Sequence, residues 1–293
     1  MMEPNNYESV SQKESSEMLS IIIPCYNDHQ HVTIAVNSAL QQNWTPKEIV
    51  IVDDGSCNKT KQVLKSFQSR MIKVITQNNQ GTSAARNNGI KCSKGKYILA
   101  LDSDDFFEPN FSRLAIGVIN SRAGIKLVTC YGRWFSSEKQ YEIHEPAGGT
   151  LQNFLYESRA FGSGLFLKKD WESAGGYDES MKLGFEDWEF YLRLLEEGGE
   201  AYVIPEVLFH YRKKKISRNS IANSRKHEIW RYIFLKHSKY YIEDFERFVT
   251  RMTLILQQKE KEKKGLRTTP DFLIGYYLLL PFRKMFRYLS SHL

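Results

Sequence analysis

The chain has 293 residues, of which 41% are hydrophobic and 13% aromatic, so it is long enough to bury a full core in one large domain and to carry an appendage. Lysine and arginine (41) outnumber aspartate and glutamate (34), which favours anionic partners such as nucleotides, phosphorylated sugars or a membrane surface. The four cysteines have neither CxxC spacing nor a histidine at zinc spacing, which argues against a disulfide framework or a structural zinc site. We expect reduced thiols in a cytoplasmic protein.

Residues 1–17 are polar and contain no apolar run, so they do not form a signal peptide and are expected to be a disordered leader. Four short β-branched runs follow, separated by stretches with apolar residues at helical spacing, which is the pattern of βαβ units. This predicts an α/β domain with a largely parallel sheet, whose ligands bind beyond the carboxyl ends of the strands. The four runs are residues 20–24, 48–54, 71–75 and 97–101.

The second part of the chain is less regular. Extended structure is predicted at residues 125–131, 164–167, 201–204 and 207–211, and an amphipathic helix over Asp187–Glu197. After Ile216 the chain becomes helical and basic.

A run of carboxylates stands directly after the predicted strand 97–101. Side chains two residues apart in an extended chain point the same way, so Asp102 and Asp104 can direct oxygens at one divalent cation of the kind that accompanies phosphates. For Asp105 alone, a helix N-cap is an alternative. The first strand is not followed by GxGxxG, and the chain has no GxxxxGK[ST], which argues against a dinucleotide enzyme and a P-loop phosphotransferase.

Five segments in order resemble the GT-A glycosyltransferases, in particular the large inverting family 2 of bacterial polysaccharide synthesis, over about residues 18–220. They are SIIIPCYND (20–28), EIVIVDDGS (48–56), NQGTSAARNNGI (79–90), GKYILALDSDD (95–105) and GFEDWEF (184–190). The resemblance implies an α/β GT-A fold, a Rossmann-like mixed sheet flanked by helices with a helical C-terminal extension. The expected catalytic domain is 18–215, with a nucleotide-binding half (18–110) and an acceptor half (111–215), followed by the basic extension 216–293.

The same resemblance implies roles for residues of the donor site. Pro24 and Tyr26 are expected to form the walls of the nucleobase slot, with Asp54 bonding the base. Asp102 would lie near the ribose and the metal, and Asp104 would be the principal ligand of Mn or Mg.

Four further residues are expected near the donor. Asp28 and Ser103 are candidate donor contacts, and Gly81 lets the backbone approach the donor. Two roles are open for Arg86, which either reaches donor oxygens or holds Asp102 from behind.

The resemblance assigns Asp187 as the base that deprotonates the acceptor hydroxyl, with Glu186 orienting the base or holding an acceptor hydroxyl. Both acids have an alternative role in complementing the dipole at the start of a helix. His210 is a candidate metal ligand or a packed, hydrogen-bonded side chain, and Arg212 a candidate diphosphate contact. Residues 213–215, all lysine, form either a solvated loop or a mobile clamp or lipid-facing patch.

The apolar run 272–280 is far shorter than the roughly 20 residues that cross a bilayer, and Pro281 ends it. With the basic and aromatic residues 282–288 it has the composition of a segment lying in a membrane interface, and packing on the domain or dimerisation is the alternative.

The predicted protein is a metal-dependent inverting glycosyltransferase, cytoplasmic or peripheral on the inner face of the cell membrane. It would use a nucleotide-sugar, expected to be a UDP-sugar, and a glycan or lipid-linked acceptor in surface polysaccharide synthesis, with no nucleic-acid partner. The alternatives are a sugar nucleotidyltransferase or retaining transferase of similar fold, and a non-catalytic binding module.

Overall fold

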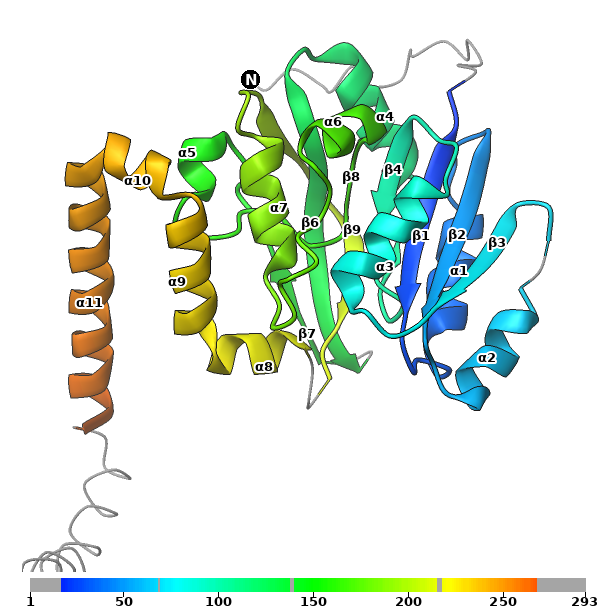
Figure 1. The fold of residues 1–293 in the computed structure, drawn as a ribbon, viewed down its shortest axis with the longest axis horizontal. Coiled ribbons are helices and arrows are strands. Elements are labelled where there is room, and N and C mark those ends of the chain that lie inside the picture. The colour runs from blue at the N-terminus through cyan, green and yellow to red at the C-terminus, as the bar shows by residue number, and fades with distance from the viewer. Residues whose placement is uncertain (1–16, 68, 138–139, 215–217, 268–293) are drawn as a thin grey trace, which may run out of the picture. The chain divides into compact units, whose positions relative to one another are not determined.

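The computed structural model describes residues 17–67, 69–137, 140–214 and 218–267. The chain divides into two compact units, one ending at Ile233 and the other beginning at Phe234. In the first unit the described strands form one nine-stranded sheet in the order β3-β2-β1-β4-β8-β6-β9-β5, with β7 paired to β6 (Figure 1). The predicted α/β class is confirmed.

The first half of the sheet is parallel, as βαβ units require. Its strands are β1 (Leu19–Cys25), β2 (Lys47–Asp54), β3 (Ile72–Gln77) and β4 (Tyr97–Ala100). The connecting helices are α1 (Val32–Leu40), α2 (Asn58–Lys65) and α3 (Thr82–Lys91). All four strands coincide with the β-branched runs, to within two residues at either end.

The second half is mixed. Strand β8 (Gly164–Leu167) runs antiparallel to β4 and to β6 (Ile125–Ser137), while β9 (Glu200–Arg212) runs parallel to β6. Two short strands complete it, β5 (Phe106–Phe107) and β7 (Gln140–His144). The two extended runs predicted near residues 201–211 are one strand, because β9 keeps its pairing with β6 across register shifts. Its helices are α4 (Phe111–Ser121), α5 (Leu151–Phe154), α6 (Lys168–Ser173) and α7 (Glu186–Leu194).

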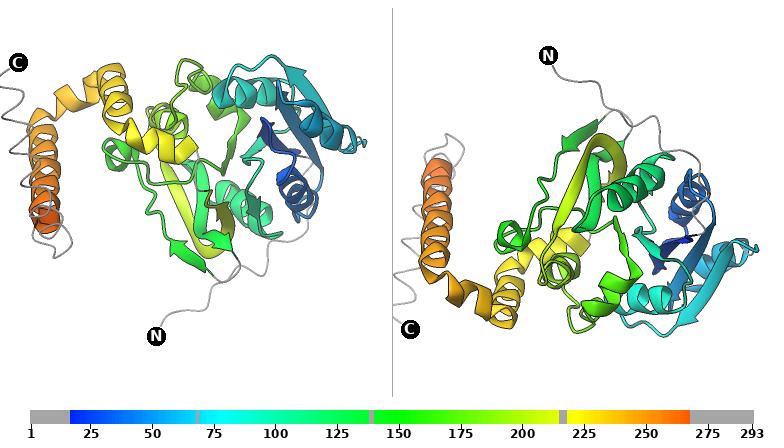
Figure 2. Two further views of the ribbon diagram at one scale, coloured as in Figure 1. Left: turned by 90° about the horizontal axis from the view of Figure 1, so that it is seen from below. Right: turned by 90° about the horizontal axis from the view of Figure 1, so that it is seen from above.

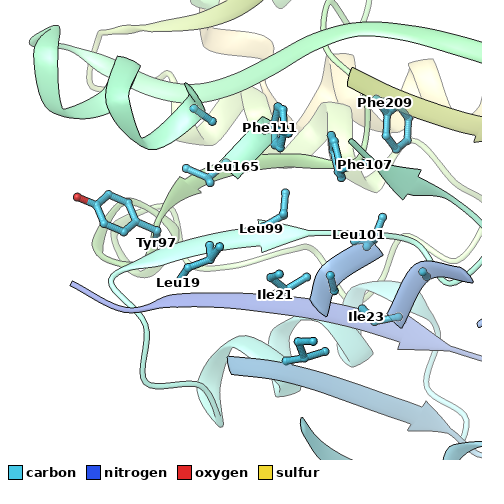
Figure 3. Close-up of a cluster of buried hydrophobic side chains, with 14 of the residues drawn as sticks. Leu19, Ile21, Ile23, Tyr97, Leu99, Leu101, Phe107, Phe111, Leu165 and Phe209 are labelled. Atoms are coloured by element: carbon cyan, nitrogen blue, oxygen red, sulfur yellow. The ribbon is translucent and has the colours of Figure 1, made fainter. Parts of the chain in front are cut away.

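Helices cover both faces of the sheet (Figure 2). On one face, side chains of β1 and β4 pack with those of α1 and α4 into a continuous apolar cluster (Figure 3). Alternate residues of β1 serve the two faces: Ile21 and Ile23 join this cluster, whereas Ile22 meets α3 on the other face, where a Cβ added at Gly89 would lie 2.5 Å from the Ile22 Cγ2 atom. This packing fixes the carboxyl ends of the strands relative to the N-terminus of α3.

Helices continue after β9 as α8 (Arg218–Ser224), α9 (Lys226–Lys236), α10 (Ser238–Glu243) and α11 (Phe245–Arg267), in agreement with the predicted helical extension. Within the second unit, Phe234, Tyr241 and Phe248 form an aromatic cluster with ring centroids 4.9 to 5.8 Å apart. Across the described ranges, no helix combines the length and apolarity that spanning a bilayer requires. The interface segment predicted at 272–288 and residues 1–16 of the predicted leader 1–17 lie outside the described residues.

Candidate active site

A cavity of about 740 Å³ opens at the carboxyl ends of β1, β2 and β4, beside the N-termini of α3 and α7. Its volume is within the range of small-molecule sites. Most of the site residues predicted from the sequence line it: Pro24, Tyr26, Asp28, Asp54, Gly81, Arg86, Asp102, Ser103, Asp104, Glu186 and Asp187. The fold therefore brings together residues as far apart in the chain as Pro24 and Asp187.

Asp54, at the end of β2, organises the loop that leads into α3. Its Oδ1 atom accepts hydrogen bonds from the Gln80 backbone N–H and the Gln77 side chain, both at 2.8 Å, and its Oδ2 atom accepts the Gly81 N–H at 2.9 Å. Gly81 has a φ of +91°, a backbone conformation that side chains disfavour, and it precedes the first turn of α3. Asp54 thus holds the shape of this wall of the cavity, whereas its predicted bond to a base stays a prediction.

The carboxylates after β4 face different partners. The Asp102 carboxylate accepts a 2.6 Å hydrogen bond from Arg86, and the Asp104 carboxylate pairs with the Lys214 ammonium at 2.8 Å. Ser103 donates to Asp28, which follows β1, at 2.9 Å. Asp105 is buried and accepts the backbone N–H of Arg212 at 2.8 Å, so it joins the end of β4 to the end of β9.

Arg86 bridges the two groups of acids. Only 2% of this residue is exposed, and its two terminal nitrogens bond Asp102 at 2.6 Å and Glu186 at 3.0 Å, while the guanidinium lies over the Tyr177 ring. A buried guanidinium needs paired carboxylates, and here it draws one from a strand end and one from a helix start. These contacts hold Asp102 from behind, and a direct reach to donor oxygens stays a prediction.

Helix α7 presents Glu186 and Asp187 at its first turn. Phe185, immediately before it, adopts a left-handed backbone conformation (φ 57°), which is strained for a bulky residue and sets the entry angle of the helix. The helix is anchored further along: the Trp188 indole donates to the Phe154 carbonyl at 2.6 Å, and the Tyr191 hydroxyl to the Phe161 carbonyl at 2.7 Å.

Asp187 is a half-buried carboxylate with a raised pKa. Burial and the neighbouring Glu186 raise its pKa to about 6, partly offset by Arg86, because a second negative charge in a desolvated site disfavours ionisation. Gly162 makes room for it, since a Cβ at this position would lie 2.6 Å from the Asp187 Oδ2 atom. The Asp187 carboxylate therefore lies at the cavity wall, next to the backbone of Gly162.

Two predicted residues are not among the described residues that line the cavity. The His210 ring bonds Glu108 through Nε2 at 2.8 Å and stacks on Phe106, with centroids 4.3 Å apart. Arg212 lies over the Phe135 ring and donates through Nε to the Asp104 carbonyl at 3.2 Å. Their predicted roles as metal ligand and diphosphate contact stay predictions.

Sequence reasoning did not identify one wall of the cavity, which consists of Trp134, His144, Phe161 and Tyr211. The Trp134 ring stacks on His144 at 4.7 Å between centroids and lies 5.4 Å from the Tyr211 ring. His144 belongs to β7, whose sequence QYEIH alternates polar and apolar residues. The alternation is misleading here, because the apolar Tyr141 and Ile143 are exposed while the polar His144 lines the cavity. The hairpin of β6 and β7 brings it to the cavity, and burial lowers its pKa.

The residues present fit a divalent metal. Among the described residues, no group of three or more His, Cys, Asp or Glu side chains is arranged to hold a metal by itself. Mg²⁺ and its analogues, however, often bind through one or two carboxylates and complete their coordination with phosphate oxygens. Asp102 and Asp104 supply oxygen donors, and burial raises the Asp104 pKa, an effect that Asp102 and Asp28 enhance and Lys214 opposes. In this structure the two carboxylates pair with Arg86 and Lys214, so a divalent ion would compete with these side chains for them.

Comparisons with known proteins place the chain among glycosyltransferases. The family model for glycosyl transferase family 2 matches residues 20–175. The chain is 30% identical over 192 residues to a chondroitin synthase of Escherichia coli, covering 62% of this chain and 27% of that protein. It is 28% identical over 281 residues to the minor teichoic acid biosynthesis protein GgaA of Bacillus subtilis, covering 90% of this chain and 59% of that protein.

Among solved structures, the S. aureus TarS 1–349 complex with UDP-GlcNAc has a similar fold, with a TM-score of 0.59 at 20% identity. The similarity covers 69% of this chain and 60% of TarS 1–349. The chain thus spans less than two thirds of each of these three proteins.

Proposed function

We infer the function of this chain from its family, because it belongs to glycosyl transferase family 2, whose model matches just over half of its residues. The GT-A fold predicted from the resemblance is confirmed by the structural neighbours. We propose that the chain moves a sugar from a nucleotide-sugar to an acceptor hydroxyl with inversion. The observation that supports this most strongly is that one cavity holds both Asp187, with a pKa of about 6, and the carboxylates that follow β4.

In the proposed reaction Asp187 accepts the proton of the acceptor hydroxyl as its oxygen bonds to the anomeric carbon. The bond from that carbon to the nucleoside diphosphate breaks, and the diphosphate leaves on the opposite face. A pKa near 6 keeps Asp187 ionised at neutral pH while leaving it basic enough to take a proton in the transition state. Glu186 bonds Arg86 and so supports the helix start from which Asp187 projects.

The donor is proposed to bind at the ends of β1 and β2, with the base between Pro24 and Tyr26. Tyr26 lines the cavity and is 54% exposed, as expected of an aromatic ring whose partner is a ligand. Asp102 and Asp104 would hold the divalent metal, which when bound neutralises charge on the diphosphate. The UDP-GlcNAc in the TarS complex supports a UDP-sugar as donor.

The proposed biological role is surface polysaccharide synthesis. Relatives named for chondroitin and minor teichoic acid synthesis support a glycan or lipid-linked saccharide as acceptor. A location in the cytoplasm or on the inner face of the membrane is part of the same proposal, because nucleotide-sugars and lipid-linked acceptors meet there.

Calorimetric titration with UDP, GDP, dTDP and CDP, with and without Mn²⁺, tests the donor site. We expect one nucleotide to bind selectively in the presence of Mn²⁺, and Asp104→Ala to abolish the metal-dependent part of binding. Absence of binding by all four nucleotides to the wild-type protein would refute the proposal.

A further inference from the structure

The loop after β9 delivers a lysine into the proposed metal site. The Lys214 ammonium lies 2.8 Å from the Asp104 Oδ2 atom and 3.8 Å from the Asp28 Oδ1 atom, and Lys214 lines the cavity. The two carboxylates follow different strands, β4 and β1. Lys214 therefore connects two edges of the cavity at the position proposed for a metal ion.

Backbone contacts fix the chain just before this lysine. The N–H of Arg212 donates to the Asp105 carboxylate at 2.8 Å, and the N–H of Lys213 donates to the Phe135 carbonyl at 2.8 Å. Residues 212 and 213 are thus held by hydrogen bonds to Asp105 and to β6, which places the Cα atom of Lys214 close to Asp104. The backbone of Lys214 is therefore positioned beside Asp104 by the contacts of the two preceding residues, and its ion pair does not depend on the flexibility of the side chain alone.

The neighbouring lysine behaves differently. Lys213 pairs at 2.6 Å with Glu142 of β7, a side chain that is 70% exposed, so this is an ordinary surface ion pair. Side chains of successive residues in an extended segment point in opposite directions, which separates Lys213 from Lys214. The Lys213 ammonium also lies over the Trp134 ring, 5.1 Å from its centroid, but Lys213 does not line the cavity. Lys213 is therefore a matched control for the loss of one positive charge that is not paired with Asp104.

The ammonium and a divalent ion need the same carboxylate. A metal ligated by the Asp104 Oδ2 atom, to which the ammonium is bonded at 2.8 Å, would lie about 2 Å from that oxygen and so within about 5 Å of the ammonium. Like charges at this separation repel strongly in a partly buried site. We propose that Lys214 is the resident cation of the Asp104 carboxylate and that a divalent ion binding to Asp104 displaces it. This inference rests on the metal role of Asp104 in the proposed function.

Titration with Mn²⁺ alone, followed by the electron paramagnetic resonance signal of the free ion, tests the competition on the full chain. Lys214→Met is expected to bind Mn²⁺ at least about tenfold more tightly than wild type, because the competing charge is gone. Lys213→Met should stay within about twofold of wild type, since its partner is on the surface. If Lys214→Met does not fold, Lys214→Gln, which also lacks the charge, takes its place.

The gain must depend on Asp104. In the Asp104→Asn background, Lys214→Met should bring no increase in affinity. Equal or weaker Mn²⁺ binding by Lys214→Met, or a gain that persists without Asp104, would overturn the inference. Nucleotide titration separates the two proposals. If the wild type binds a nucleotide but Lys214→Met does not bind Mn²⁺ more tightly, only the competition is refuted. If Lys214→Met binds Mn²⁺ more tightly but no nucleotide binds, only the proposed donor is refuted.

Discussion

Replacing Gly162 with alanine tests the position of the proposed base with a single methyl group. The added Cβ would lie 2.6 Å from the Asp187 Oδ2 atom and 3.3 Å from its Cγ atom. Real contacts of this kind are not shorter than 3.0 Å, so the carboxylate must move by at least 0.4 Å. Gly162 does not have a left-handed backbone conformation, so the substitution adds no backbone strain there.

A shift of this size in a group that must meet the acceptor hydroxyl is expected to lower kcat by about 10- to 100-fold. This corresponds to about 1.4 to 2.7 kcal/mol in the activation barrier. The assay for kcat is the release of nucleoside diphosphate from the donor. Nucleotide affinity, measured by calorimetry, should be unchanged, because Gly162 belongs to the loop before β8 and not to the proposed nucleobase slot.

Two variants control this experiment. Gly117→Ala, within α4 where an added Cβ meets nothing within 4 Å, should leave kcat unchanged and stabilise the protein by about 0.5 to 1 kcal/mol. In an Asp187→Ala background the Gly162→Ala change should cost no further activity, because the group that it displaces is absent. Full wild-type kcat in Gly162→Ala would refute the reasoning, since the base would then tolerate displacement or lie elsewhere.

The remaining predictions concern the charged groups of the cavity. Arg86→Met should lower the free energy of unfolding, measured by chemical denaturation, by about 3 kcal/mol, because it leaves buried Glu186 without this partner. Water compensates Asp102 in part, since its side chain is 35% exposed. An unchanged denaturation midpoint would contradict the stabilising role of the Arg86 ion pairs. The value of kcat/KM should fall about tenfold per pH unit below about pH 6. The pKa of Asp187 is raised to about 6, so its ionised, basic form is lost as the pH drops through that value. A constant kcat/KM down to pH 5 would exclude Asp187 as the base. Asp54→Asn should lower the free energy of unfolding by about 1 to 3 kcal/mol and weaken nucleotide binding. The amide cannot accept every hydrogen bond that the carboxylate accepts from the loop before α3. Unchanged nucleotide affinity by calorimetry would show that this loop does not shape the donor site.

Much of the fold was predictable because local pattern and tertiary structure agree in the first half of the chain. The β-branched runs become buried parallel strands, and the acids that follow them come together at one edge because parallel strands end on the same side. The amphipathic pattern after Glu186 likewise became α7, anchored through Trp188. In these segments the periodicity was sufficient to predict the element, because the tertiary contacts favour the same structure.

The rest depended on long-range contacts that periodicity does not encode. The hairpin of β6 and β7 brings Trp134 and His144 to the cavity, although neither stands in a motif. The run of three lysines gave no way to distinguish Lys213 from Lys214, because the difference arises from the strand pairing of β9. His210 and Arg212 were expected near the donor because of the resemblance. Their contacts with Glu108 and Phe135 depend on the pairing of β9 with β5 and β6, which the sequence pattern does not contain.

The central claim is that this cavity transfers sugar from a nucleotide donor with Asp187 as base. The most direct measurement is nucleoside diphosphate release from a panel of UDP-, GDP-, dTDP- and CDP-sugars, comparing wild type with Asp187→Asn. We predict release from the sugars of one nucleotide by the wild type, and a rate at least about 100-fold lower for Asp187→Asn at equal nucleotide affinity. Equal rates for the two proteins, or no release from any donor by a wild-type protein that binds the nucleotide, would contradict the account.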